Sequence, residues 1–223
     1  MTLPIGTYSF YNQFENCPHK AWHLYVLKDI PYVETPEMKW GNDVHSAMEH
    51  AIKDGTPLPK TMVAAAIVAD AFHQAYTLLP VHVEYKLAMS ARGAPVDYWA
   101  KDAWFRGKLD CAVFNISRHD AWLTDWKTGN VREEPFELET NALLLKVNYP
   151  DLVSITGEYF WMKTGKNGLR YTLNQHDKTF GKLQALRTEA ESYERAGEWP
   201  KRKNPLCGYC RVFTCEHNKN KER

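Results

Sequence analysis

Two aspartates in neighbouring apolar segments constrain the fold and the chemistry of this chain more than any other feature of its sequence. Asp110 ends the segment Trp104–Asp110, and Asp125 lies near the end of a second alternating stretch that finishes at Lys127. Residues two apart on a strand share a face, so Asp125 and Lys127 are predicted to point to the same side of a sheet. Two carboxylates beside an ammonium can hold a hard divalent cation, Mg²⁺ or Mn²⁺, and act on a phosphodiester.

One imidazole and two further carboxylates are candidates for the same site. His45 and Glu49 lie four residues apart and share one face of a predicted helix, from which His45 is expected to reach the metal. Glu84 lies on the strand before the Asp110 strand, where a surface position is expected unless it binds the metal or positions a water. For Asp125 and Lys127 the alternative is a weak surface ion pair.

The predicted elements describe one α/β (α+β) domain, residues 1–223, in which helices flank a short mixed central sheet. Helices are expected at 7–30 with a break at Cys17-Pro18, at 41–55, at 60–79, at 136–147 and at about 174–196. Strands are expected at 81–90, 104–115, 121–127, 153–163 and 169–173. The core stripe of the 60–79 helix is predicted to be Val63, Ile67, Ala71, Ala75 and Leu78.

The distribution of charge and hydropathy argues against a membrane-spanning or secreted protein. No apolar run is long enough to span a bilayer, and the N-terminus lacks the features of a signal peptide, which predicts a cytoplasmic protein without a membrane partner. Residues 201–223 carry seven Lys/Arg and two Glu, a net charge of +5 that can attract a polyanion. No phosphate-binding loop of an ATPase is present, so any unwinding of a duplex requires a helicase or a recombination partner protein.

The cysteine pattern predicts a second metal site. Three of the five cysteines cluster near the C-terminus, at Cys207, Cys210 and Cys215. A closed site needs a fourth ligand, which Cys17 supplies if the two chain ends meet, and His217 is its rival. Four thiolates suit a [4Fe–4S] cluster or a structural Zn²⁺, whereas three thiolates and an imidazole favour zinc. Unliganded core thiols are the alternative, and this is the expectation for Cys111.

Five motifs in this order resemble the PD-(D/E)XK nuclease superfamily, and within it the RecB-like branch. Within that branch the chain looks like iron–sulfur CRISPR-associated exonucleases and phage-encoded recombination exonucleases. The motifs are Phe14-Glu-Asn-Cys17-Pro18, Gly41-x-x-x-His45, Gly107-Lys-Leu-Asp110, Asp125-Trp-Lys127-Thr-Gly129 and the Cys207, Cys210, Cys215 triplet. One segment departs from the family, because Glu137-Leu-Glu-Thr-Asn141 stands where Gln-x-x-x-Tyr is frequent, and this leaves the DNA contact of that helix open.

The resemblance implies a restriction-endonuclease-like core and a metal-dependent DNA exonuclease that acts in recombination, repair or phage DNA processing. Its partner would be single-stranded or end-bearing DNA, in a bacterial or phage-infected cell. The implied Mg²⁺ or Mn²⁺ ligands are His45, Asp110, Asp125 and the backbone carbonyl of Trp126, and Lys127 would activate the attacking water. Glu49, Glu84 and Glu137 are further candidates.

The resemblance also implies that Cys17 and the C-terminal triplet hold a [4Fe–4S] cluster, which would clasp residues 1–30 to residues 200–223. Closing so long a loop would stabilise the domain. Two other functions remain open at this point. One is a non-catalytic DNA-binding or assembly protein on the same fold, and the other is an interaction module clasped by zinc.

Overall fold

The structure, a computed structural model, describes residues 3–219, which form two compact units. One unit runs from Glu34 to Thr179. The other combines the residues before Glu34 with those from Phe180 onward. The last four residues of the predicted basic segment, 220–223, lie outside the described residues.

The unit from Glu34 to Thr179 is built around one mixed sheet. Its strands are β1 (Val81–Ser90), β2 (Pro95–Val96), β3 (Ala103–Asn115), β4 (Asp120–Lys127), β5 (Ser154–Trp161), β6 (Lys166–Asn167) and β7 (Tyr171–Thr172). The order in the sheet is β2-β1-β3-β4-β5-β6, and β7 also pairs with β5. Only the β4–β5 pair among these described strands is parallel. A mixed sheet flanked by helices confirms the predicted fold class.

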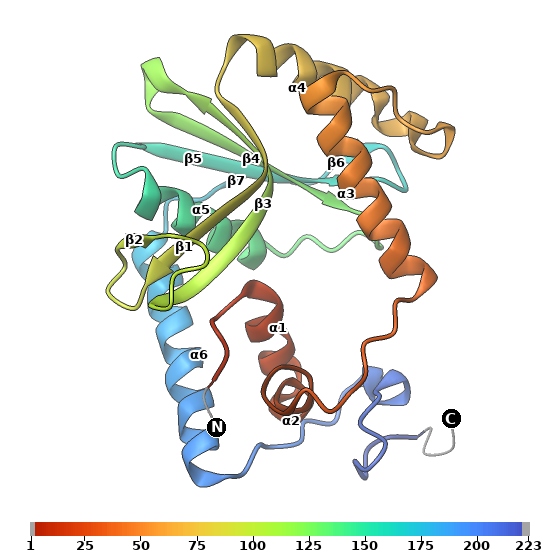
Figure 1. The fold of residues 1–223 in the computed structure, drawn as a ribbon, viewed down its shortest axis with the longest axis vertical. Helices are drawn as coiled ribbons and strands as arrows, with labels where there is room; N and C mark the ends of the chain where they lie inside the picture. The colour runs from red at the N-terminus through yellow and green to blue at the C-terminus, as the bar shows by residue number, and fades with distance from the viewer. Residues whose placement is uncertain (1–2, 220–223) are drawn as a thin grey trace. The chain divides into compact units, whose positions relative to one another are not determined.

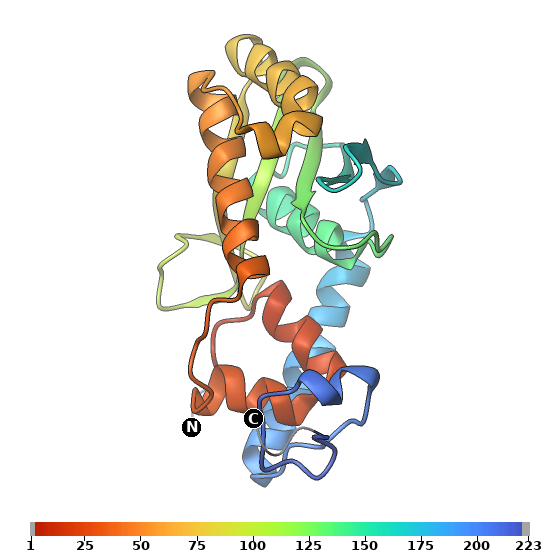
Figure 2. The ribbon, with the colours of Figure 1, turned by 90° about the vertical axis from the view of Figure 1, so that its right-hand side faces the viewer.

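Helices cover both faces of this sheet. Figures 1 and 2 show α3 (Pro36–Asp54) and α4 (Ala66–Leu78) on one face and α5 (Phe136–Asn148) on the other. α5 approaches β3 closely at Gly107, where a Cβ atom would lie 2.8 Å from Leu144 Cδ1. A larger residue at this position would push the helix away from the strand that carries Asp110.

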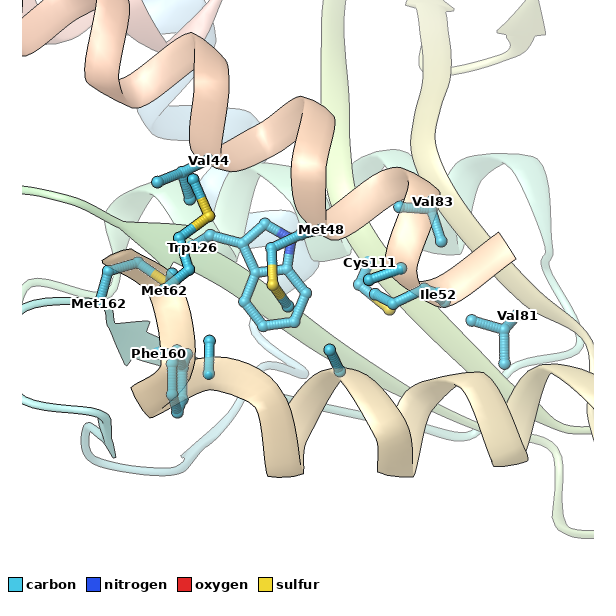
Figure 3. Close-up of a cluster of buried hydrophobic side chains, with 13 residues drawn as sticks. Val44, Met48, Ile52, Met62, Val81, Val83, Cys111, Trp126, Phe160 and Met162 are labelled. Atoms are coloured by element: carbon cyan, nitrogen blue, oxygen red, sulfur yellow. The ribbon is translucent and has the colours of Figure 1, made fainter. Parts of the chain in front are cut away.

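A hydrophobic cluster between the sheet and helices α3 and α4 anchors strand β4 (Figure 3). Trp126 of β4 is buried at its centre, with Val44 and Met48 of α3 packed in the same cluster. The Trp126 ring makes edge contacts with Phe72 of α4 and Phe160 of β5, at centroid separations of 5.6 and 6.1 Å. Because large aromatic rings dominate core packing, this cluster fixes the strand on which Asp125 and Lys127 lie. Cys111 is buried in the same cluster, as predicted.

The start of α3 differs from the prediction. The helix begins at Pro36 and not at Gly41, because the side chain of Thr35 accepts a hydrogen bond from the Met38 N–H at 3.3 Å. Proline often marks a loop, but in the first turn of a helix, where Pro36 lies, its missing N–H has no intrahelical partner to lose. Gly55 ends the helix as predicted, with a φ of 67°.

The face that α4 buries also differs from the prediction. Three members of the predicted stripe are mostly exposed, at 72%, 83% and 82%: Val63, Ile67 and Leu78. The residues that are buried instead are Met62, Ala65 and Ala69. The segment is apolar around much of its circumference, so the spacing of its apolar residues does not determine which face is buried. The alanines determine it, because their small side chains allow the helix to approach the sheet. Three members of the predicted stripe, Ile67, Ala71 and Ala75, line an open apolar pocket of about 320 Å³ together with residues of the sheet.

The second unit is helical in its described part. It contains α1 (Tyr8–Asn16), α2 (Pro18–Ala21), a π-helical segment η1 (Trp22–Leu27), most of α6 (His176–Ala196) and the short 3₁₀ helix η4 (Pro205–Tyr209). The predicted break at Cys17-Pro18 is confirmed. Phe14 packs against Tyr193 and Trp199, each at a centroid separation of 5.9 Å, which joins the two ends of the chain in one core. Among the described residues, no helix is both long and apolar enough to cross a membrane.

Candidate active site

The site begins at an irregularity in the β1–β3 ladder. Val83 pairs with Cys111 and Tyr85 pairs with Leu109, so Glu84 lies opposite Asp110. Glu84 has a φ of 54°, a left-handed conformation that residues with a Cβ rarely adopt and that marks local strain. The residues on either side of Glu84 reach different parts of the structure. Val83 packs in the cluster beneath α3 and α4, whereas the hydroxyl of Tyr85 bonds to Tyr149 at the end of α5.

α3 places an imidazole against this irregularity. His45 follows Val44, which is buried against the sheet, so the His45 ring lies at the edge of the buried helix face. Its Nδ1 atom is 3.2 Å from Glu84 Oε1 and 3.2 Å from Asp110 Oδ1. The three potential ligand atoms of His45, Glu84 and Asp110 all lie within 4.8 Å of one another, and they form the only such group of three among the described residues.

Asp110 is held by the end of the neighbouring ladder. Pairing between β3 and β4 ends at Cys111 and Thr124, so the backbone beyond Thr124 is free of β3. The N–H of Trp126 instead donates to Asp110 Oδ2 at 2.8 Å. One carboxylate oxygen of Asp110 is thereby fixed, and the other faces His45. Asp110 is 5% exposed, so this bond forms away from water and orients the side chain firmly.

Asp125 and Lys127 point to one side of β4, as predicted, and meet a carboxylate from α5. Lys127 Nζ lies 2.7 Å from Asp125 Oδ2 and 2.5 Å from Glu137 Oε2. It also lies 5.3 Å from the centre of the Tyr159 ring. Glu137 stands in the first turn of α5, where the positive end of the helix dipole favours a carboxylate.

The electrostatics of these groups reflect crowded negative charge. Burial lowers the pKa of His45, but hydrogen bonds and charges from Asp110 and Glu84 outweigh it and raise the pKa to about 10. Burial, followed by the charges of Asp110 and Glu137, raises the pKa of Asp125 well above its usual range. Burial also lowers the pKa of Lys127, but Asp125 and Glu137 more than reverse this and keep its ammonium charged.

A model of the PD-(D/E)XK nuclease superfamily matches residues 7–215. The chain belongs to this superfamily. Its members are generally metal-dependent nucleases, which agrees with an imidazole and two carboxylates gathered beside an Asp–Lys pair. The PD-(D/E)XK match spans most of the chain and covers every residue of this site.

A comparison with solved structures agrees on the fold. The crystal structure of SSO0001 matches with a TM-score of 0.55, covering 98% of this chain and 89% of that one, at 13% sequence identity. At this identity the likeness shows the fold alone. The comparison with curated proteins gives no significant match.

The residues present fit a hard divalent cation. Carboxylates and one imidazole are suitable donors for Mn²⁺ and Mg²⁺. Against the effect of burial, the carboxylates of Asp110 and Glu84 raise the pKa of His45, and burial followed by the charges of Asp110 and Glu137 raises the pKa of Asp125. A divalent cation bound here would offset the same negative charge.

The ligand set differs in part from the predicted one. His45 and Asp110 come together as predicted, but the third member of the group is Glu84, a residue for which a surface position was favoured. The charge of Asp110 adds to burial in raising the pKa of Asp125, so the two carboxylates are neighbours. The ion-pair partner of Asp125, however, is Lys127. A metal-binding role for Asp125 and for the Trp126 carbonyl stays a prediction. Glu49 does not join the group, because it pairs with Lys53 at 2.6 Å on the same helix.

Reasoning from the sequence missed the connection between Glu84 and Lys108, which form an ion pair across the β1–β3 ladder. The sequence shows only that charged residues interrupt two apolar strands. The register that places Glu84 opposite Asp110 and Lys86 opposite Lys108 is centred on Asp97 and is seen only in the structure. Charged residues directly opposite one another inside two apolar strands indicate a site.

The candidate cluster ligands lie in the other unit. Cys17 separates α1 from α2, Cys207 belongs to η4, and Cys210 and Cys215 follow. Three hydrogen bonds join the chain on either side of Cys17 to residues 200–204: Arg202 to the Glu15 carbonyl at 2.8 Å, Asn204 to the Asn16 carbonyl at 3.2 Å, and the His19 N–H to the Pro200 carbonyl at 3.0 Å. Within residues 3–219, no three of these thiols and His217 lie within 4.8 Å, so they do not form a preassembled single-ion site.

Replacing Glu84 by glutamine is expected to weaken Mn²⁺ binding by about tenfold or more, because it removes one of two carboxylates in the ligand group. Calorimetric titration with Mn²⁺ measures the change. Glu49→Gln is the matched control, since Glu49 lies on the His45 helix but pairs with Lys53, and its affinity should stay within about twofold. Equal Mn²⁺ affinity in the wild-type and Glu84→Gln proteins would remove Glu84 from the site.

Proposed function

We propose that this protein is a Mg²⁺- or Mn²⁺-dependent DNA exonuclease of the RecB-like branch of the PD-(D/E)XK superfamily. The observation that carries the proposal is the meeting of His45, Glu84 and Asp110 within 4.8 Å, next to the 2.7 Å pair of Lys127 and Asp125. Superfamily membership supports a nuclease, and the order of the histidine, aspartate and cysteine motifs supports the RecB-like branch.

Each side chain has a role that follows from its surroundings. A bound divalent ion would polarise the phosphate and increase the acidity of a bound water. Lys127 carries a positive charge held between Asp125 and Glu137, so it can orient that water and offset charge that grows on the phosphate. The N–H of Trp126 keeps Asp110 in one orientation, which prepares the ligand group before any ion binds.

The proposal includes the substrate and its setting. The substrate is DNA with a free end or a single-stranded region, processed in the cytoplasm of a bacterial or phage-infected cell during recombination, repair or phage DNA processing. A duplex would have to be opened by a helicase or another partner protein, because the sequence contains no phosphate-binding loop of its own.

The test is digestion of end-labelled single-stranded and double-stranded DNA by anaerobically purified protein, with Mn²⁺ or Mg²⁺ added. We expect labelled mononucleotides or short fragments from linear DNA and no cutting of closed circular DNA. Cutting of the circle would indicate an endonuclease. DNA binding without any digestion would favour the non-catalytic assembly protein.

We further propose that Cys17, Cys207, Cys210 and Cys215 hold a [4Fe–4S] cluster that clasps residues 1–30 to residues 200–223. The hydrogen bonds of residues 200, 202 and 204 to the chain around Cys17 support this, because they bring the two segments together without the metal. Thiolates of a four-iron cluster bind different irons, whereas a single Zn²⁺ needs all its ligands within one small tetrahedron. Among the described residues no three thiols lie within 4.8 Å of one another, so this arrangement fits a single Zn²⁺ less well than a four-iron cluster.

Cys17→Ser is expected to lower the iron content per protein and the melting temperature together, because one ligand joins the two chain ends. Iron analysis, visible absorbance and thermal unfolding of anaerobic samples measure both effects. Cys111→Ala is the control, since Cys111 is buried in the other unit and should leave iron content unchanged. Full metal content in Cys17→Ser together with its loss in His217→Ala would indicate a local Cys3His zinc site instead.

A further inference from the structure

A row of cationic side chains begins at the candidate active site and follows one face of the β1–β3 ladder. Lys108 forms an ion pair with Glu84, and Lys86 lies directly opposite Lys108. Arg106 precedes Lys108 by two residues on β3, so it lies on the same face. At the rise of a strand, Arg106 is about 14 Å along the ladder from Asp110.

The row ends at an exposed aromatic residue. Trp99 lies in the segment 97–102, which joins β2 to β3, and its side chain is 69% exposed. Lys86 Nζ and Arg106 Cζ lie 5.6 and 5.1 Å from the centre of its ring. The same two cations lie 5.8 and 5.0 Å from the ring of Tyr98.

Local contacts hold this segment in shape. Asp97 Oδ1 accepts a hydrogen bond from the Trp99 N–H at 2.8 Å, and Arg106 donates to the Tyr98 carbonyl at 3.4 Å. The Trp99 ring is thus presented by an ordered turn, and little freedom would be lost if a planar ligand stacked on it.

A single exposed tryptophan on a protein surface needs no explanation by itself. Here, however, the ring is flanked by two cations and stands at the end of a cationic row that starts at the metal ligands. Single-stranded nucleic acid is the ligand that matches both features, because its bases stack on aromatic rings while its phosphates contact lysine and arginine. A duplex keeps its bases stacked on one another and would use only the cations.

We propose that Trp99 is a stacking platform for one base of single-stranded DNA, and that Lys86 and Arg106 contact the phosphates between this base and the candidate active site. The inference rests on the proposed function, since it supplies a reason for a strand to run along this face. A separation of about 14 Å corresponds to about four nucleotides stacked as in duplex DNA, and to fewer in an extended strand. The stacked base should therefore lie within about five nucleotides of the bond to be cleaved.

Equilibrium binding of a labelled single-stranded 12-mer tests the platform. Ca²⁺ replaces Mg²⁺, since it takes the same oxygen ligands at longer distances and should not support cleavage. Trp99→Ala should weaken binding by roughly five- to thirtyfold, and Trp99→Phe should keep most of the affinity. Arg106→Ala should also weaken binding, and Lys166→Ala is its control, because Lys166 is an exposed cation on β6 at the opposite edge of the sheet.

A second experiment places an abasic site at successive positions of the same oligonucleotide. It distinguishes the loss of base stacking from a general effect of the substitution on the folding of the protein. For the wild-type protein one position within about five nucleotides of the end held at the active site should weaken binding. For Trp99→Ala the same abasic site should have no further effect, because the stacking partner is already missing.

The outcomes distinguish the platform from the nuclease. Four results would each overturn the platform. Trp99→Ala could bind the 12-mer as tightly as the wild-type protein, or its binding could still be weakened by the abasic site. Trp99→Ala could lose as much affinity for blunt duplex as for the 12-mer, or the wild-type protein could fail to bind the 12-mer at all. Cleavage by the wild-type protein would still stand in those cases. Conversely, if Trp99→Ala behaves as expected but the wild-type protein digests no DNA with Mn²⁺ or Mg²⁺, the platform stands and the proposed nuclease function fails.

Discussion

Lys127→Ala is expected to reduce DNA digestion by roughly 10²–10³-fold or more, because it removes the cation that we propose acts on the water and the phosphate. Its Nζ atom lies 2.7 Å from Asp125 and 2.5 Å from Glu137, so it is held in place before the substrate binds. Single-turnover digestion of end-labelled DNA measures the loss. Mn²⁺ binding should be largely retained, since the group formed by His45, Glu84 and Asp110 does not include the lysine.

Two controls keep this result interpretable. Removing the ammonium leaves Asp125 and Glu137 without their shared cation, so thermal unfolding must show that the variant is folded at the assay temperature. Lys127→Arg keeps the charge, but a broad guanidinium does not replace a compact ammonium in this buried position, and we expect little recovery of activity. Near-normal turnover of folded Lys127→Ala would show that the lysine has no catalytic role.

Asp110→Asn is expected to reduce Mn²⁺ affinity by about 100-fold or more and to abolish digestion. Asp110 is buried and uses both oxygens, one for the Trp126 N–H and the other towards His45. An asparagine removes the negative charge and offers one oxygen only, so either the metal or the backbone bond loses its partner. Calorimetry with Mn²⁺ and the digestion assay measure the two effects.

Asp43→Asn provides the comparison for Asp110→Asn. Asp43 lies on the His45 helix but forms an exposed ion pair with Lys39 at 2.9 Å, so its loss should change Mn²⁺ affinity by less than about twofold. Asp125→Asn should show an intermediate loss of affinity, because Asp125 lies near Asp110 but is paired with Lys127. If Mn²⁺ bound equally well to wild-type protein and to Asp110→Asn, the metal would have to bind at another place.

The sequence alone was sufficient for the elements that depend on local pattern. The alternation around Asp125 and Lys127 predicted a strand with both side chains on one face, and β4 has that arrangement. The same alternation placed Cys111 in the core, away from the ligands. Strand alternation repeats every two residues whatever the rest of the fold does, so these features can be predicted without knowing any partner strand.

The sequence was less informative where two signals competed. Pro36 is both a turn residue and a favoured first residue of a helix, and the Thr35 cap decided in favour of the helix. The segment 60–79 carries more than one apolar stripe, and the fit of Ala65 and Ala69 against the sheet decided which one is buried. In both cases a contact with neighbouring structure selected between local patterns of similar strength.

Tertiary structure alone decided how the candidate active site is assembled. Glu84 becomes a ligand candidate because the register of β1 with β3 places it opposite Asp110 and because its positive φ turns it towards His45. Glu137 meets Lys127 because α5 packs on the face of the sheet to which that lysine points. These are contacts between residues 10 to 39 positions apart. Sequence periodicity shows which face a side chain occupies, but which residue it meets across that face is determined only when strands pair and helices pack.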